Sequence, residues 1–276
     1  MKRLSLLLLL LLLAACGDHK PPGWLGYGEG DNSLIGVPQP GWITHLGVQR
    51  GQFVKRGDFL FSLDDTHETA LRDQAAANLA QAKSSLAQEQ ANLVYTQTQL
   101  TRQTGLARVH AGVPSTYDQT LASFKESQAH IEQLEGQIRQ MEGALTDAAY
   151  QLSQRHIVSQ VDGQVQDIYF FEGEYVPAST AVVSVLPPGN VFVRFFVPEP
   201  EFARVKLGQT VAISCDGCAA NMTAKITFIA QQEEFTPPVI FSVDSRQKLV
   251  FKLEARAPGG LKLNPGEPVE VRPLGS

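Results

Sequence analysis

The feature that most constrains the fold is a heptad pattern in the first half of the chain. From Thr66 to about Val109 there is no proline and the only glycine is Gly105, so the segment can form one long helix. Leucines recur in it every seven residues, which is typical of the seam of a coiled coil. The seam positions are Leu79, Leu86, Leu93 and Leu100.

A second heptad segment follows the interruption HAGVPST and runs from Ser115 to about Arg155. Its apolar row consists of Phe124, Ile131, Ile138, Leu145 and Leu152. Two helical segments of matched length, joined by a short turn, can cover each other's apolar rows as an antiparallel pair. The pattern therefore predicts a helical hairpin over residues 66–156. A run of about 44 residues would be roughly 65 Å long.

Two similar β segments flank the predicted hairpin. The first, GWITHLGVQRGQFVKRGDFLFSLDD, spans 41–65, and the second, IVSQVDGQVQDIYFFEGEYVPASTAVVSVL, spans 157–186. Both alternate apolar and polar residues, turn at glycines and end on an apolar strand. The repeat predicts one small β-sandwich, split by the hairpin into residues 33–65 and 157–188.

The remaining residues, 189–276, predict a small β-barrel domain with longer strands. The expected strands are VFVRFFV, QTVAIS, MTAKITFIA, KLVFKLEA and PGEPVEVRP, and PEPEFARV is predicted to be a short helix opened by proline. The two prolines of EEFTPPVIFS favour a loop or an edge at that point. The predicted fold class is therefore multidomain α+β.

The N-terminus predicts secretion. Lys2 and Arg3 precede an apolar run of about ten residues, whereas a membrane-spanning helix needs roughly 20, so residues 1–15 are interpreted as a signal peptide. Ordinary cleavage after Ala15 is one possibility, although the large Leu13 disfavours it.

The sequence LAAC at the end of this run instead resembles a bacterial lipobox. That resemblance implies a thioether-linked lipid on Cys16, which becomes the mature N-terminus and anchors the protein to a membrane. Residues 16–32 are rich in glycine, proline and polar residues and are predicted to be an extended tether.

Composition and motifs disfavour several functions. A net charge of −5 without a basic run disfavours nucleic-acid binding. The six histidines are scattered without ligand spacing, so no metal site is predicted. Asp64 and Asp65 stand at a strand-to-helix junction, where they are expected to cap the helix. Without a nucleophile elbow or a phosphate-binding loop, the sequence predicts neither an enzyme nor a cofactor.

Two cysteines remain once Cys16 is set aside. Cys215 and Cys218 flank the dipeptide DG, whose turn geometry would bring their α carbons within disulfide range. We predict a disulfide; a reduced or merely packed pair is the alternative.

The order of these segments resembles that of a periplasmic adaptor subunit, also called a membrane fusion protein, of the HlyD secretion family. The resemblance implies that residues 33–65 and 157–188 form a split lipoyl-like β-sandwich with an inserted antiparallel coiled-coil α-hairpin, followed by a small β-barrel. The stretches CDGC and EFTPPVIFS resemble the branch that accompanies ABC-type exporters.

The resemblance also implies partners. Such adaptors form rings, often of six copies, and join an inner-membrane transporter to a TolC-like outer-membrane channel. This places the chain in the periplasm of a Gram-negative bacterium, anchored by its lipid. The inner membrane is the expected location. The inner-membrane retention signal is an aspartate directly after the lipidated cysteine, whereas this chain has Gly17 there and its aspartate, Asp18, one residue later.

The family's channel-docking motif lies at the hairpin tip. Arg102 and Leu106 match its arginine and leucine, whereas Val113 stands at its serine position and Ser115 lies two residues later. We predict that this tip meets the channel. Alternatively, Leu106 and Val109 only close the end of the coiled coil.

Two other functions stay open at this level. A covalent lipoyl or biotinyl carrier shares the half-motifs but needs an acceptor lysine at the hairpin between them, and Lys55 lies in a different turn. A coiled-coil lipoprotein spacer without a transporter would not require the barrel. The transported substrate cannot be derived from these patterns.

Overall fold

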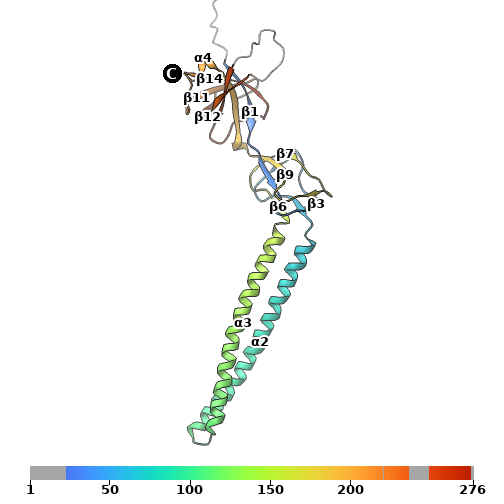
Figure 1. The fold of residues 1–276 in the computed structure, drawn as a ribbon, viewed down its shortest axis with the longest axis vertical. Coiled ribbons are helices and arrows are strands. Elements are labelled where there is room, and N and C mark those ends of the chain that lie inside the picture. Colours follow the sequence, from blue (N-terminus) through green and yellow to red (C-terminus); the bar gives the residue numbers. More distant parts are fainter. Residues whose placement is uncertain (1–22, 220, 236–248, 275–276) are drawn as a thin grey trace, which may run out of the picture. The chain divides into compact units, whose positions relative to one another are not determined.

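The computed structural model describes residues 23–219, 221–235 and 249–274 (Figure 1). The chain divides into two compact units. One contains residues 34–160 and 167–184, and the other contains the described residues among 23–33, 161–166 and 185–274. The signal peptide, Cys16 and most of EFTPPVIFS lie outside the described residues. Within the described ranges, no helix has the length and hydropathy needed to cross a membrane.

The long hairpin is present as predicted. Helix α2 spans Thr66–Arg108 and α3 spans Pro114–Ser153, and the two lie side by side (Figure 1). Pro114 occupies the first turn of α3, where a backbone N–H has no acceptor within the helix, so its absence breaks no helical hydrogen bond. The buried hydrophobic residues of the seam are Leu79, Leu134 and Ala148.

Polar residues occupy two positions of this seam. Thr96 and Ser127 are buried between the helices. Because buried hydroxyls need hydrogen-bond partners, Thr96 donates to the carbonyl of Leu93, and Asn92 Nδ2 donates to Ser127 Oγ over 3.1 Å.

The split β-sandwich consists of two four-stranded sheets. One has the order β2 (Ser33–Gly36), β9 (Ala181–Leu186), β7 (Gly163–Ile168), β4 (Phe53–Val54). The other has the order β6 (His156–Val158), β5 (Phe59–Leu63), β3 (Gly41–Leu46), β8 (Tyr175–Val176). Each sheet combines strands from before and after the hairpin, which confirms the predicted split fold.

The barrel is closed by six strands. Their order is β1 (Trp24–Gly30), β10 (Val191–Pro198), β13 (Leu249–Arg256), β12 (Met222–Phe235), β11 (Thr210–Ser214), β14 (Pro268–Pro273). Phe195, Leu253 and Val271 are fully buried in its core. The short helix α4, Glu199–Phe202, and the 3-10 turn η1, Pro188–Asn190, flank β10.

The predicted tether over 16–32 is wrong from Trp24 to Gly30, because these residues form β1, and the barrel therefore extends beyond residues 189–276. Trp24 is buried and stacks on Phe195, with ring centroids 5.7 Å apart. A Cβ atom at Gly26 would lie 2.4 Å from the carbonyl oxygen of Arg194. Glycine serves here for close packing against β10, whereas in the sequence it suggested flexibility.

Candidate functional site

The hairpin tip is a tight turn between α2 and α3. His110 adopts a left-handed conformation with φ of 57°, and the amide of Ala111 donates to the carbonyl of Leu106 over 3.0 Å. Gly112 lies so close that a Cβ there would approach the Ala107 nitrogen to 3.2 Å. The backbone of the tip is therefore fixed by its own hydrogen bonds.

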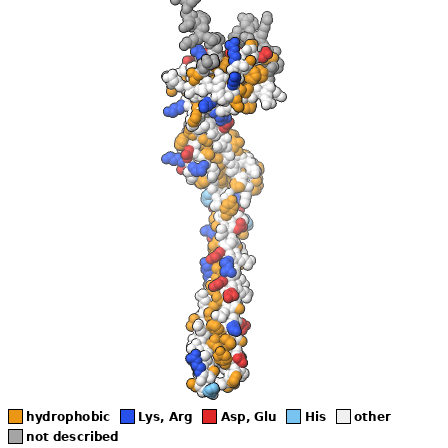
Figure 2. Space-filling view, turned by 90° about the vertical axis from the view of Figure 1, so that its left-hand side faces the viewer, with side chains coloured by type: hydrophobic (Ala, Val, Ile, Leu, Met, Phe, Trp, Pro, Cys, Tyr) orange, Lys and Arg blue, Asp and Glu red, His pale blue; other side chains and the backbone are white. Residues whose placement is uncertain are grey.

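The predicted docking residues all lie on the surface of this tip. Arg102 and Ser115 are exposed, and Leu106 and Val113 are 39% and 61% exposed. Val109, which the family motif does not include, is 69% exposed. Leu106 is thus partly covered within this chain, and Val109 is largely exposed. Figure 2 shows hydrophobic side chains on the surface near the end of the hairpin, with basic side chains close by.

A group of polar side chains from both helices lies near the middle of the hairpin. Asn92 Nδ2 donates to Glu89 Oε1 over 3.0 Å, and His130 Nδ1 lies 3.4 Å from Glu89 Oε2. The hydrogen bond from Asn92 is the main cause that holds the pKa of Glu89 below its ordinary value. Glu89, Asn92, Ser127 and His130 line a shallow groove between the helices.

The base of the hairpin is held by an ion pair. Arg155 Nη2 donates to Glu68 Oε1 over 2.5 Å, and Nη1 donates to the Pro40 carbonyl over 2.9 Å. Burial by itself would raise the pKa of Glu68, but the hydrogen bond and charge of Arg155 outweigh it, so the pKa lies below its ordinary value. This arrangement fastens both helices to the β-sandwich.

Asp64 and Asp65 have separate structural roles. Asp64 Oδ1 accepts hydrogen bonds from the backbone and side chain of Thr66, which caps the start of α2. Asp65 makes no capping bond and instead faces His156, 3.3 Å away. The hydrogen bonds from Thr66 lower the pKa of Asp64. The predicted capping role thus fits Asp64, and the two side chains have different partners.

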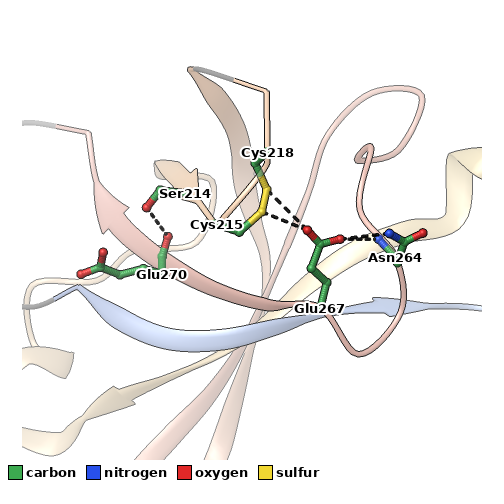
Figure 3. Close-up of a disulfide and its surroundings, with 6 residues drawn as sticks. All are labelled: Ser214, Cys215, Cys218, Asn264, Glu267 and Glu270. Carbon is green, nitrogen blue, oxygen red and sulfur yellow. Dashed lines mark hydrogen bonds between the residues drawn. A yellow bond between two sulfur atoms is a disulfide. The ribbon is translucent and has the colours of Figure 1, made fainter.

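The barrel contains a third arrangement, shown in Figure 3. Cys215 and Cys218 form a disulfide across the turn between β11 and β12, with their α carbons 5.3 Å apart. Gly217 in this turn has φ of 92°, which favours glycine. Glu267 Oε1 lies 3.2 Å from Cys215 Sγ and 3.9 Å from Cys218 Sγ. Sequence reasoning missed Glu267, because it is 49 residues from Cys218 and no spacing pattern connects them.

The described residues thus form a split β-sandwich with an inserted α-hairpin, and a β-barrel. Residues 78–155 match the family model described as "RND MFP, alpha-helical hairpin domain".

Solved structures share the fold. MacA from Actinobacillus actinomycetemcomitans superposes with a TM-score of 0.69 at 22% identity, over 91% of this chain and 79% of that one. The membrane fusion protein Spr0693 from Streptococcus pneumoniae R6 gives a TM-score of 0.55 at 15% identity, over 91% of this chain and 98% of that one. These findings confirm the resemblance to membrane fusion proteins that the sequence predicted.

One curated relative also matches. It is a UPF0194 membrane protein in the asrC 5' region of Acidithiobacillus ferridurans, 29% identical over 114 residues, or 41% of this chain. The match spans about a third of that relative's length, 34%.

Proposed function

We propose that this protein is a lipid-anchored periplasmic adaptor that connects an inner-membrane exporter to an outer-membrane channel. The observation that carries the proposal is the hairpin: two helices of 43 and 40 residues end in a tip whose Arg102, Leu106 and Val113 are exposed. Apolar side chains exposed at the end of a rigid element favour contact with another protein. The family match over residues 78–155 supports the same conclusion.

The tip chemistry suits a protein partner. Arg102 and Leu106 are four residues apart on α2, so their side chains share one face. A guanidinium can donate several hydrogen bonds to carbonyl or carboxylate oxygens, while the leucine packs beside it. Self-assembly into a ring, with six copies as the family resemblance implies, would present several such tips to one channel.

The lipid anchor and the transporter class are further parts of the proposal. Cys16 would carry the lipid, on the strength of LAAC, and would hold the adaptor at the inner membrane. CDGC and EFTPPVIFS support an ABC-type exporter, whereas the matching hairpin model is described for RND systems. Identifying the transporter that copurifies with the protein distinguishes the two classes.

The carrier alternative requires a modified lysine. Lys55 lies in the turn between β4 and β5, where its amide donates to Asp58 Oδ2 over 2.8 Å. The hairpin helices occupy the connection between the two β halves, where a carrier would display its lysine. An intact mass for the secreted chain without a lipoyl or biotinyl addition on Lys55 is the expected result.

The docking proposal is tested with the double variant Arg102→Asp, Leu106→Asp. Two acidic residues would replace a cation and an apolar contact at the tip, so we expect loss of export and of channel copurification. The transporter should still copurify. The matched control is Arg139→Asp, Leu71→Asp, which makes the same change at exposed hairpin positions away from the tip; Leu71 is 37% exposed, close to Leu106.

Circular dichroism and membrane fractionation of both variants establish that fold and anchoring are intact. Normal export by a folded tip variant would show that the tip is not the contact. Copurification of neither transporter nor channel with the wild-type protein would favour the spacer alternative.

A further inference from the structure

The barrel brings together three groups that can ligate a metal ion. The Sγ atoms of Cys215 and Cys218 and a carboxylate oxygen of Glu267 all lie within 4.8 Å of one another. We propose that the reduced form of this cysteine pair, with Glu267, binds one thiophilic divalent cation of the Zn²⁺ type. The proposal is independent of the adaptor function.

The orientation of Glu267 is the first argument. Its Oε2 accepts hydrogen bonds from the backbone amide and the side-chain Nδ2 of Asn264, over 2.9 and 3.3 Å. These bonds turn Oε1 toward the two sulfur atoms, as Figure 3 shows. Disulfide sulfurs carry no hydrogen, so the oxidised pair offers this negative oxygen no donor. A cation bound between the sulfurs and Oε1 would satisfy it.

The distances are the second argument. Tetrahedral zinc with bonds of about 2.3 Å to sulfur and about 2.1 Å to oxygen places a sulfur and an oxygen ligand about 3.6 Å apart. The two oxygen–sulfur distances here, 3.2 and 3.9 Å, lie on either side of that value. The largest change is in the sulfur–sulfur distance, which has to increase to about 3.8 Å once the disulfide is broken; each oxygen–sulfur distance changes by only about 0.4 Å.

The supporting backbone is the third argument. Two cysteines separated by two residues have a spacing that zinc sites use, and here they lie in a turn between paired strands. Glu267 directly precedes β14, which pairs with β11 from Val211 to Ser214. All three ligands therefore come from neighbouring points of one barrel. Each is partly exposed, so an ion can enter and water can complete the coordination.

The metal-bound form and the disulfide exclude each other. Cys215 and Cys218 are synthesised as thiols; binding the cation releases their two protons and leaves two thiolates as ligands. In the alternative reaction a second disulfide, acting as the oxidant, accepts two electrons and two protons from the same thiols; it becomes a dithiol and the Cys215–Cys218 S–S bond forms. Returning from the disulfide requires a reductant, such as a dithiol or a phosphine.

The experiment uses the full chain in detergent, with Cys16→Ser so that Cys215 and Cys218 are the only thiols. The protein is reduced with a phosphine under anaerobic conditions and titrated with Co²⁺, whose thiolate charge-transfer band reports sulfur ligation. Zn²⁺ is then added to displace it. We expect one Co²⁺ per reduced chain and no band from the oxidised chain.

Variants test each ligand. Cys218→Ser should abolish the band. Loss of a residue that only supports a metal ligand weakens metal binding roughly 10-fold to 100-fold. Glu267→Gln removes a ligand itself, so it should weaken Co²⁺ binding by more than this. Asp216→Asn makes the same charge change within the turn and is the control, because Asp216 is exposed and lies outside the three-residue cluster.

Failure of the reduced chain to take up Co²⁺ would overturn the site. Equal affinity of Glu267→Gln and Asp216→Asn would remove Glu267 from it and so contradict the three-ligand proposal.

Discussion

Arg155 and Glu68 form an ion pair at the base of the hairpin, with side chains only 12% and 7% exposed. Arg155 follows the second helix and Glu68 lies in the first turn of α2, so the pair joins the two ends of an insertion of about 90 residues. Substituting either partner of this ion pair therefore tests whether it holds the base of the hairpin together.

Removing one partner should destabilise this base. We expect Arg155→Leu to lower the free energy of unfolding by about 3 kcal/mol, because it leaves a buried carboxylate unpaired. Glu68→Gln keeps a hydrogen-bond acceptor and should cost about 1–2 kcal/mol. Urea unfolding followed by circular dichroism measures both. Equal stability of Arg155→Leu and the wild type would show that the pair does not hold the hairpin.

The same pair predicts a pH dependence. The pKa of Glu68 is lowered in the fold from an ordinary value of 4.5, so its stabilising contribution is complete above that value. The contribution is lost as the pH falls through the lowered pKa of the folded state. The Tm of the wild type should therefore fall more steeply below pH 4.5 than that of Glu68→Gln. Parallel curves for the two proteins would contradict this.

The glycines of β1 offer a direct test of the barrel boundary. Gly26→Ala should destabilise the barrel by about 1–3 kcal/mol, because its new methyl group would collide with the backbone of β10. Gly189→Ala is the matched control, since nothing lies within 4 Å of a Cβ atom there. Thermal unfolding of the two variants should differ. If Gly26→Ala were as stable as Gly189→Ala, residues 24–30 would behave as the tether that the sequence suggested.

The disulfide should be present in protein isolated from an oxidising compartment. Thiol labelling under denaturing conditions should then find neither Cys215 nor Cys218 free. The loop is short, so reduction should cost only about 2 kcal/mol of barrel stability or less. Full labelling of both cysteines would contradict the oxidised form.

Lipidation is tested by Cys16→Ala. Without the thiol no lipid can be attached, so the protein should leave the membrane fraction and export should fail. Fractionation and immunoblotting measure this. A variant that stays membrane-bound with its signal uncleaved would point to the leucine run as the anchor.

Patterns that repeat along the sequence predicted most of the fold. The heptad repeat from Leu79 to Leu100 predicted the hairpin, and the similarity of the two β segments predicted the split sandwich. Features that depend on distant partners were not predictable. Gly26 suggested a linker in the sequence, because the neighbour that requires a glycine there, Arg194 of β10, is 168 residues away along the chain. Glu267 gains its role only from the pairing of β11 with β14.

The most direct test of the adaptor proposal is a photo-crosslink from the hairpin tip. A photoreactive residue at Val109, which directly follows α2 and is 69% exposed, is compared with one at Val94, which lies within α2 and is 65% exposed. Illumination of intact cells should crosslink position 109 to an outer-membrane channel and position 94 to another copy of the chain or to nothing. If position 109 crosslinks to no channel while the protein is folded, anchored and active in export, the proposed connection through the tip is wrong.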